Sequence, residues 1–422
     1  MPADVTGPPR ATNGHMSAAR GRGATRKGTA TSDERTSRLT ERIYRALDAE
    51  LPAAVELRHR LHADPRRSGD ESETAQAVAH ALGHGDGERV ANAGRAILCR
   101  TASSAGHTIA LRAEMDALPI VERTGVPWAS TTGAMHACGH DVHLAGLVAA
   151  SRAITAVEPP VSVLALLQPR EEAAPSGARD IVESGMLDRF ETAAVIAAHV
   201  QPRVPLGSVA LTPGLVNASV DEINVTVVGK EGHVGYPHTV TDPVLALANI
   251  TIALQQVAAR RVDPTHGAVC ALTEIHAGNT ANVVPGSATG RGTLRLLDAA
   301  DRARMVIEVN GIIQHAAAAY GCTADIDITT GEPALINDAN LAIATGHRLA
   351  RSGQRIVTDF RSFGADDFAY YCERGPALMA FVGVGEPGGP GLHEATFLPP
   401  DDAVATVAHT LIAGYLAATD AH

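Results

Sequence analysis

Short apolar runs of strand length recur along the chain, and each is followed by residue types that act in catalysis or bind metals. The four runs are Thr108–Leu111, Val161–Leu167, Ala193–Ala198 and Ala377–Val382. Near-continuous apolar runs are typical of strands that are covered by helices on both faces. In open α/β sheets, ligands bind beyond the carboxyl ends of the strands. The pattern therefore predicts an α/β sheet with a functional site at that edge.

The middle of the chain has a different pattern and predicts an inserted domain. Its expected elements are strands at 222–228, 269–276, 288–297 and 323–329, and helices at 243–260 and 299–319. The order β-α-β-β-α-β is that of a split βαβ, ferredoxin-like unit. We therefore expect an α+β lid or dimerisation domain at 218–330. Residues 41–217 and 331–422 would form one discontinuous catalytic domain, with a mixed central sheet flanked by helices.

Charge and composition narrow the class of protein. Residues 1–40 are basic, rich in Gly, Ala, Ser and Thr, and predict a disordered tail, with a transit peptide or a nucleic-acid arm as the alternative. Apolar spacing predicts helices at 37–62 and 71–82. The net charge of -11 argues against nucleic-acid binding, and no apolar run approaches the ~20 residues that span a bilayer. Five cysteines without a CxxC motif are typical of a reducing compartment, so we expect a cytoplasmic protein.

Metal-ligand residue types are concentrated in the segment Met135–His143, which holds three His, one Cys and one Asp. Thiolate and imidazole are good ligands for zinc-like ions. Cys138 and His140 are two residues apart before a predicted helix, so both side chains can face one ion. The alternative is a polar helix start with one small hydrophobic Cys. His199 and His393, which follow two other apolar runs, favour metal ligation.

Carboxylates follow two of the same runs. Glu171 and Glu172 are adjacent and diverge, so one can bind metal while the other exchanges protons with water and with a leaving amine. The alternative is two surface acids in a loop. Asp116 lies among apolar residues and is expected to orient a ligand imidazole. Glu114, on the same face of the strand, is expected to bond nearby polar groups or to be a structural acid.

Two polar residues of the inserted domain are candidates for substrate binding. His233 and Asn282 could each donate a hydrogen bond to the substrate from a lid, where a donor stabilises developing negative charge. A histidine in a surface loop and an asparagine in a turn are the alternatives.

Together these segments resemble peptidase family M20, specifically its amidohydrolase subgroup, over about residues 45–415. The matching motifs are Leu111–Pro119, Met135–His143, Gln168–Glu172 with Ser176–Ala178, His199–Val200, Gly232–His238 with Asp242–Pro243, Asn282–Pro285 with Gly292–Arg295, Ala365–Phe368 and Leu392–His393.

The resemblance implies a set of site residues. The metal ligands would be Cys138, His140, Glu172, His199 and His393, with Cys138 bridging two divalent ions per subunit. Zn²⁺ or Mn²⁺ is expected, with Ni²⁺ or Co²⁺ as alternatives. Glu171 would be the general acid/base and Asp116 would support a ligand. His233 and Asn282 would come from the lid domain, through which a homodimer is expected to form.

The implied activity is hydrolysis of the amide bond of N-acyl or N-aroyl amino acids, or of similar small amides. A dipeptidase or aminopeptidase with the same metal core is the alternative, as is a catalytically inactive metal-binding homologue. The chain departs from the family pattern at Glu114, where Asp is usual, at Ala365–Asp366, where Ser and Glu are usual, and at Arg170, where a small residue is usual. Arg170 could alter the pKa of the acid pair or narrow the pocket.

Overall fold

The structure is a computed structural model that describes residues 32–421 except 84, 86, 91–92 and 100–105, and omits the side chains of 32–36. Contacts divide the chain into residues 1–38 and 39–422. Most of the tail expected at 1–40 lies outside the described residues. Helix α1 (Ser32–Ala63) nevertheless begins five residues before its predicted start at 37. The sequence Ser-Asp-Glu at this point is typical of a helix N-terminus, and apolar spacing alone does not detect it.

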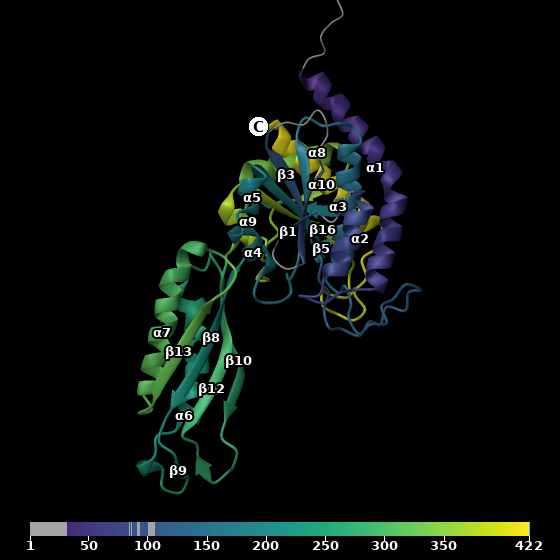
Figure 1. Cartoon of the computed structure of the whole chain (residues 1–422). Coiled ribbons are helices and arrows are strands. Elements are labelled where there is room, and N and C mark those ends of the chain that lie inside the picture. Colours follow the sequence, from purple (N-terminus) through teal and green to yellow (C-terminus); the bar gives the residue numbers. More distant parts are fainter. Residues whose placement is uncertain (1–31, 84, 86, 91–92, 100–105, 422) are drawn as a thin grey trace, which may run out of the picture. The chain divides into compact units, whose positions relative to one another are not determined.

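An eight-stranded mixed sheet is formed by strands from before and after the inserted segment (Figure 1). Its order is β1-β2-β4-β3-β5-β16-β6-β15, with bounds β1 Glu88–Val90, β2 Gly94–Cys99, β3 Thr108–Glu114, β4 Ser162–Gln168, β5 Thr192–Pro205, β6 Ser208–Ala210, β15 Arg355–Val357 and β16 Ala377–Gly385. The neighbours β4, β3, β5 and β16 are mutually parallel. These are the four apolar runs, so their carboxyl ends meet at one edge, and the predicted fold class is confirmed.

Helices cover both faces of this sheet, which explains why the strands are apolar along their length. In β3, Ile109 and Leu111 join the core under α1, α2 (Ser72–Ala81), α3 (His140–Thr155), α8 (Ala339–Arg351) and α10 (Asp402–Asp420). Ala110 joins the opposite core, under α4 (Gly177–Glu183), α5 (Met186–Arg189) and α9 (Ala369–Arg374). Successive side chains of a strand point to opposite faces, so both sets must be apolar. Among the described residues, no helix is long and apolar enough to cross a membrane.

Strand β5 differs from the prediction because it does not end before His199. It continues to Pro205, while β3 pairs with it no further than Ala197. Strand β16 runs beside it and supplies backbone partners at this point, with Phe381 opposite His199. His199 therefore projects from a strand that extends beyond its neighbour β3.

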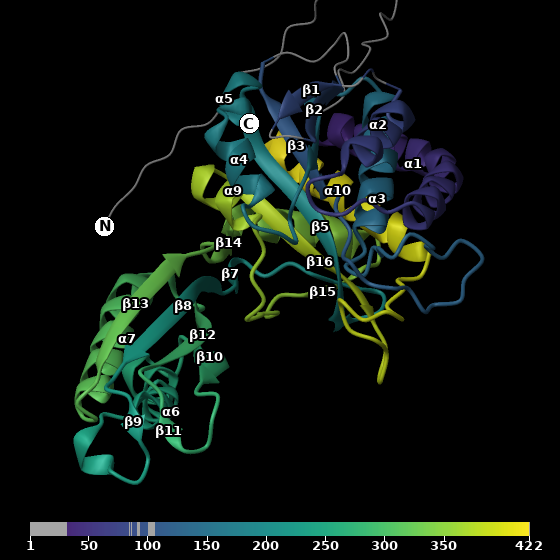
Figure 2. The same ribbon diagram turned by 60° about the horizontal axis from the view of Figure 1, so that its bottom comes forward.

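A separate four-stranded antiparallel sheet has the order β10-β12-β8-β13 (Figure 2). Its elements are β8 Ser219–Val228, α6 Pro243–Ala253, β10 Ala268–Ala277, β12 Ser287–Leu296, α7 Arg302–Ala318 and β13 Thr323–Thr330, in the expected β-α-β-β-α-β order. Helices α6 and α7 contact each other and pack on the sheet around a core of their own. The helix expected to reach residue 260 is regular only to Ala253 and ends in a π-helical turn, Val257–Arg261.

Strands β1, β2, β6 and β15 of the central sheet were not predicted, and neither were two pairs of very short strands outside it. The two pairs are β7 Gly214–Asn217 with β14 Leu335–Asn337, and β9 Gly232–His233 with β11 Val283–Val284.

Candidate metal centre

Five candidate metal ligands converge beyond the carboxyl ends of the central strands. They are Cys138 and His140 at the start of α3, Glu172 after β4, His199 in β5, and His393 between β16 and α10. Cys138 Sγ lies 3.4 Å from His199 Nε2, and His393 Nε2 lies 3.0 Å from Glu172 Oε1. The ligand atoms of Cys138, His140 and Glu172 lie within 4.8 Å of one another. The structure therefore brings together all five residues that the sequence nominated.

Gly139 determines how Cys138 and His140 are presented. It caps the N-terminus of α3 in the left-handed region, with φ 81°. A Cβ at this position would lie 2.4 Å from Cγ2 of Val200. A larger residue would be strained by its backbone conformation and would also displace β5 next to His199. Glycine is thus required for the two candidate ligands to lie on either side of a tight turn.

The donor atoms suit a cation. The Nδ1 of His140 donates to the carbonyl oxygen of Asp116 at 2.8 Å, so in the neutral ring, the form that binds a metal, Nε2 carries the lone pair. That Nε2 is buried and has no hydrogen-bond partner among the described residues. Burial, together with the carboxylates of Glu172 and Glu171, raises the pKa of Cys138 well above 9. A thiolate at Cys138 therefore needs added positive charge nearby, which bound metal ions would provide.

Asp116 links two of the segments that carry candidate ligands. Its backbone oxygen accepts from His140, and its Oδ2 accepts the backbone N–H of Glu172 at 2.9 Å and the hydroxyl of Ser68 at 2.7 Å. Burial opposes ionisation, but the hydrogen bond and charge of His140 lower the pKa of Asp116 to about 2. An ionised Asp116 that joins His140 to the Glu172 segment fits the orienting role expected of it.

Glu171 lies beside the candidate ligands. Its Oε2 is 3.8 Å from His140 Nε2, and its carboxylate is within 4.8 Å of those of Asp366 and Asp367. Burial and the charges of Asp366, Glu172 and Asp367 raise the pKa of Glu171 well above its usual 4.5. A carboxyl group with a raised pKa holds a proton more readily, as a group that delivers a proton to a leaving amine must.

Through its side chain, Arg170 contacts the loop that precedes α4 and helix α4 itself. Its backbone has φ 47°, and its guanidinium binds the carbonyl oxygen of Pro175 at 3.1 Å and the carboxylate of Asp180. The side chain therefore braces the loop that precedes α4, and its charge is neutralised by Asp180. Arg170 is not among the main causes of the raised pKa of Glu171, and its effect on the width of the pocket stays a prediction.

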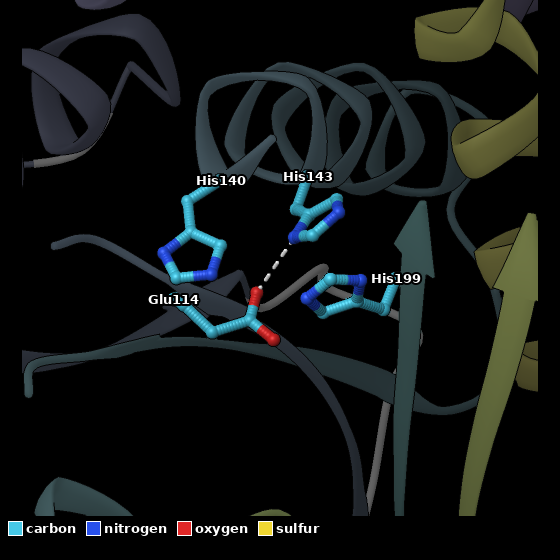
Figure 3. Close-up of side chains that lie close together, drawn as sticks. All are labelled: Glu114, His140, His143 and His199. Carbon is cyan, nitrogen blue, oxygen red and sulfur yellow. Dashed lines mark hydrogen bonds and ion pairs between the residues drawn. The ribbon is translucent and has the colours of Figure 1, made fainter. Parts of the chain in front are cut away.

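A second group of possible ligands overlaps the first, and Figure 3 shows its members: Glu114, His140, His143 and His199. The Nδ1 of His143 donates to Glu114 Oε2 at 2.9 Å, and the other oxygen of Glu114 pairs with Arg112. The Nε2 of His143 accepts the backbone N–H of Val200 at 2.9 Å. Protein groups thus occupy both nitrogens of His143 and both oxygens of Glu114. Glu114 therefore bonds nearby polar groups, which was the first of the two interpretations of the sequence.

A buried polar network behind the site was missed by the sequence analysis. Arg112 donates to Asp367 at 2.9 Å and to Gln168 at 2.8 Å. Gln168 also donates to Asp367 and accepts the hydroxyl of Tyr371 at 2.9 Å. Arg112 and Glu114 are two residues apart in an otherwise apolar strand, and this pair of charges in a buried strand was the available signal.

The two candidates from the inserted domain lie near each other. His233 in β9 is paired with Val283 in β11, and the backbone N–H of Val234 donates to the carbonyl oxygen of Asn282 at 3.2 Å. Both residues are exposed. The two residues thus lie in neighbouring segments at the β9–β11 ribbon of the inserted domain.

Comparison with known proteins identifies the family. The pattern of peptidase family M20/M25/M40 matches residues 110–413. The chain is 32% identical over 363 residues to an N-acetyldiaminopimelate deacetylase of Shouchella clausii, covering 85% of this chain and 96% of that protein. It is 33% identical over 334 residues to an N-acetyl-L-cysteine deacetylase of Bacillus subtilis, covering 78% of this chain and 80% of that protein.

Solved structures agree. A putative aminohydrolase of methicillin-resistant Staphylococcus aureus superposes with a TM-score of 0.82 at 28% identity, covering 89% of this chain and 98% of that one. The YXEP protein of B. subtilis, described as a dinuclear metal-binding peptidase from the M20 family, superposes with a TM-score of 0.76 at 29% identity, covering 88% and 98%. The chain belongs to peptidase family M20/M25/M40.

Proposed function

We propose that this protein is a dinuclear metal-dependent amidohydrolase that cleaves the amide bond of N-acylated amino acids or similar small amides. The observation that carries the proposal is the convergence of the five candidate ligands with Glu171 beside them. The names of the two deacetylase relatives support an N-acyl substrate for this chain as well.

The residues that would hold two divalent ions are Cys138, His140, Glu172, His199 and His393, and Cys138 would be the ligand shared by both. Thiolate, imidazole and carboxylate together suit Zn²⁺ or Mn²⁺, and Ni²⁺ or Co²⁺ would also fit. Bound ions would act as Lewis acids that activate water and polarise the amide carbonyl.

The chain's own residues move the protons and hold the substrate. Glu171 takes a proton from the attacking water and delivers it to the amide nitrogen as the C–N bond breaks. Asp116 keeps the imidazole of His140 oriented through its backbone and side-chain contacts. His233 and Asn282, from the inserted domain, donate hydrogen bonds to the substrate as negative charge develops on its carbonyl oxygen.

A substrate panel tests this function. Purified protein loaded separately with Zn²⁺, Mn²⁺, Ni²⁺ or Co²⁺ would be assayed with N-acetyl amino acids, N-benzoyl amino acids and unblocked dipeptides. We expect kcat/KM to be at least tenfold higher for one of the N-acyl classes than for any dipeptide. A preference for dipeptides would instead establish the peptidase alternative, and no turnover with any metal would indicate the inactive homologue.

We also propose that the inserted domain joins two copies of the chain. Strand β10 is an edge of its sheet and pairs only with β12 among the described strands. Such an edge offers unpaired backbone groups to another chain. Exposed apolar side chains lie on β10 and on α6, including Ile275 at 48% and Ile252 at 71% exposure. A backbone edge beside apolar side chains is suited to a symmetric interface.

Sedimentation velocity tests the dimer. We expect the wild-type protein to sediment as a dimer and Ile252→Glu to shift it toward the monomer, because the change places a charge in the proposed interface. Ile343→Glu, at a 48% exposed position on α8 in the other domain, is the matched control and should remain dimeric. A monomeric wild-type protein, or an unaffected Ile252→Glu variant, would contradict the proposal.

A further inference from the structure

We propose that His143, held in a single tautomer by Glu114, is a positioning residue that fixes the backbone carrying His199 and thereby sets the metal affinity of the centre. The proposal rests on the function proposed above in one respect, since it takes His199 as a ligand. No substrate or metal contact is assigned to His143 itself.

The place of His143 follows from the end of strand β3. Pairing between β3 and β5 stops at Ala197, so β5 loses this neighbour before it reaches His199. The backbone N–H of Val200 then donates to Nε2 of His143 at 2.9 Å. A buried N–H without a partner is costly, and the imidazole supplies the acceptor that a strand would otherwise provide.

The same residue, Val200, also controls the orientation of His199. The Nδ1 of His199 donates to the carbonyl oxygen of Val200 at 2.6 Å, and its Nε2 lies 3.4 Å from Cys138 Sγ. The ring of His199 is therefore hydrogen-bonded to Val200, and its backbone is joined directly to Val200. A shift of the Val200 N–H would move the Nε2 of His199 relative to the other proposed ligands.

Glu114 determines which nitrogen of His143 is protonated. A nitrogen that accepts the Val200 N–H carries no proton, so the proton of the neutral ring is on Nδ1 and is donated to Glu114 Oε2 at 2.9 Å. Arg112, which can only donate, pairs with the other oxygen of Glu114 and holds the carboxylate in place. Arg112, Glu114 and His143 are each about 1% exposed, so water does not compete for these bonds.

The variant Glu114→Gln tests the tautomer directly. Because Arg112 offers only donors, the amide oxygen of Gln must face Arg112 and its NH₂ must face His143. The ring would then accept at Nδ1 and carry its proton on Nε2, opposite the Val200 N–H. In metal-free, full-length protein labelled with ¹⁵N-histidine, we expect the wild-type His143 resonances to report the Nδ1-protonated form and those of Glu114→Gln to report the Nε2-protonated form. The same tautomer in both proteins, or an Nε2-protonated wild type, would overturn the proposal.

Two substitutions of His143 distinguish a positioning role, through the hydrogen bond to Val200, from a role in filling space. The amide of Gln reaches about as far as Nε2 and can still accept the Val200 N–H, whereas the amide of Asn ends near the position of Nδ1. The Zn²⁺ affinity, measured by competition with a chelator, should fall ~10–100-fold in His143→Asn, the range typical for partners of ligands. In His143→Gln the loss of Zn²⁺ affinity should be several-fold smaller than in His143→Asn. Equal losses in the two variants, or no loss in either, would contradict the role of His143.

Glu122→Gln is the matched control, because Glu122 is a buried carboxylate that contacts a different histidine, His62, at 3.1 Å. It should keep the wild-type Zn²⁺ affinity and leave the His143 tautomer unchanged. The NMR measurement needs no metal, so a failure of the proposed metal centre is distinguishable. In that case the wild-type protein would not bind Zn²⁺, while the tautomer would still respond to Glu114→Gln.

Discussion

Replacing Glu171 by Gln is expected to leave the metal content of the protein nearly unchanged while lowering kcat by about 10²–10⁴-fold, the range attributed to general acid–base catalysis. Gln keeps the shape of the side chain but cannot take a proton from water or give one to the amide nitrogen. Burial and the neighbouring carboxylates raise the pKa of Glu171, which suits a group that must release its proton later in the cycle. Metal analysis and steady-state kinetics on the same preparation provide the measurement.

Glu183→Gln is a suitable comparison for this variant. Glu183 lies on α4, is exposed, and pairs with Arg179. Its removal should leave kcat and KM within about twofold of wild type, since a surface ion pair contributes little to the rest of the structure. A Glu171→Gln protein that retains most of its activity would exclude Glu171 as the acid/base.

Replacing Cys138 by Ala is expected to cost bound metal and, with it, nearly all activity. The thiol is buried among carboxylates and lies between His199 and the segment that carries Glu172. In the proposed centre Cys138 is shared by both ions, so its loss should reduce the metal content below two per chain and raise the Kd of the ion that remains. Metal analysis after dialysis, with activity measured before and after adding Zn²⁺ or Mn²⁺, gives the result.

Cys270→Ala controls for the loss of a buried thiol. Cys270 is 3% exposed in the core of the inserted domain, far along the chain from the proposed ligands. This variant should keep two ions per chain. Two ions retained by Cys138→Ala as well would remove Cys138 from the bridging position.

The regular part of the fold was predictable because its signals are local. Apolar runs located the four central parallel strands. The alternation of strands and helices after residue 218 predicted the order along the chain of the elements that form the second sheet. The features that could not be predicted from the sequence depend on contacts between segments that are far apart in the chain. Strand β5 continues past His199 because β16 lies beside it, and short strands such as β7 exist only through pairing with β14.

The same distinction applies to the site. Residue types and motif order nominated the five proposed ligands and Glu171, and the structure places them together. The proposed role of His143 could not be predicted from the sequence, because it depends on a contact with Val200, 57 positions away in the chain. The direction of the Arg170 side chain was equally hidden, since a residue with positive φ points its side chain differently from its neighbours.

The position of β16 has a consequence for synthesis of the protein on the ribosome. Four of the proposed ligands lie before the inserted domain, and His393 follows it. Phe381 pairs with His199 across 182 residues of chain, and contacts between such distant segments form late and slowly. A nascent chain that has emerged only as far as the second sheet lacks both the strand that supports His199 and the fifth proposed ligand. We therefore expect all five proposed ligands to come together only after translation of the last segment.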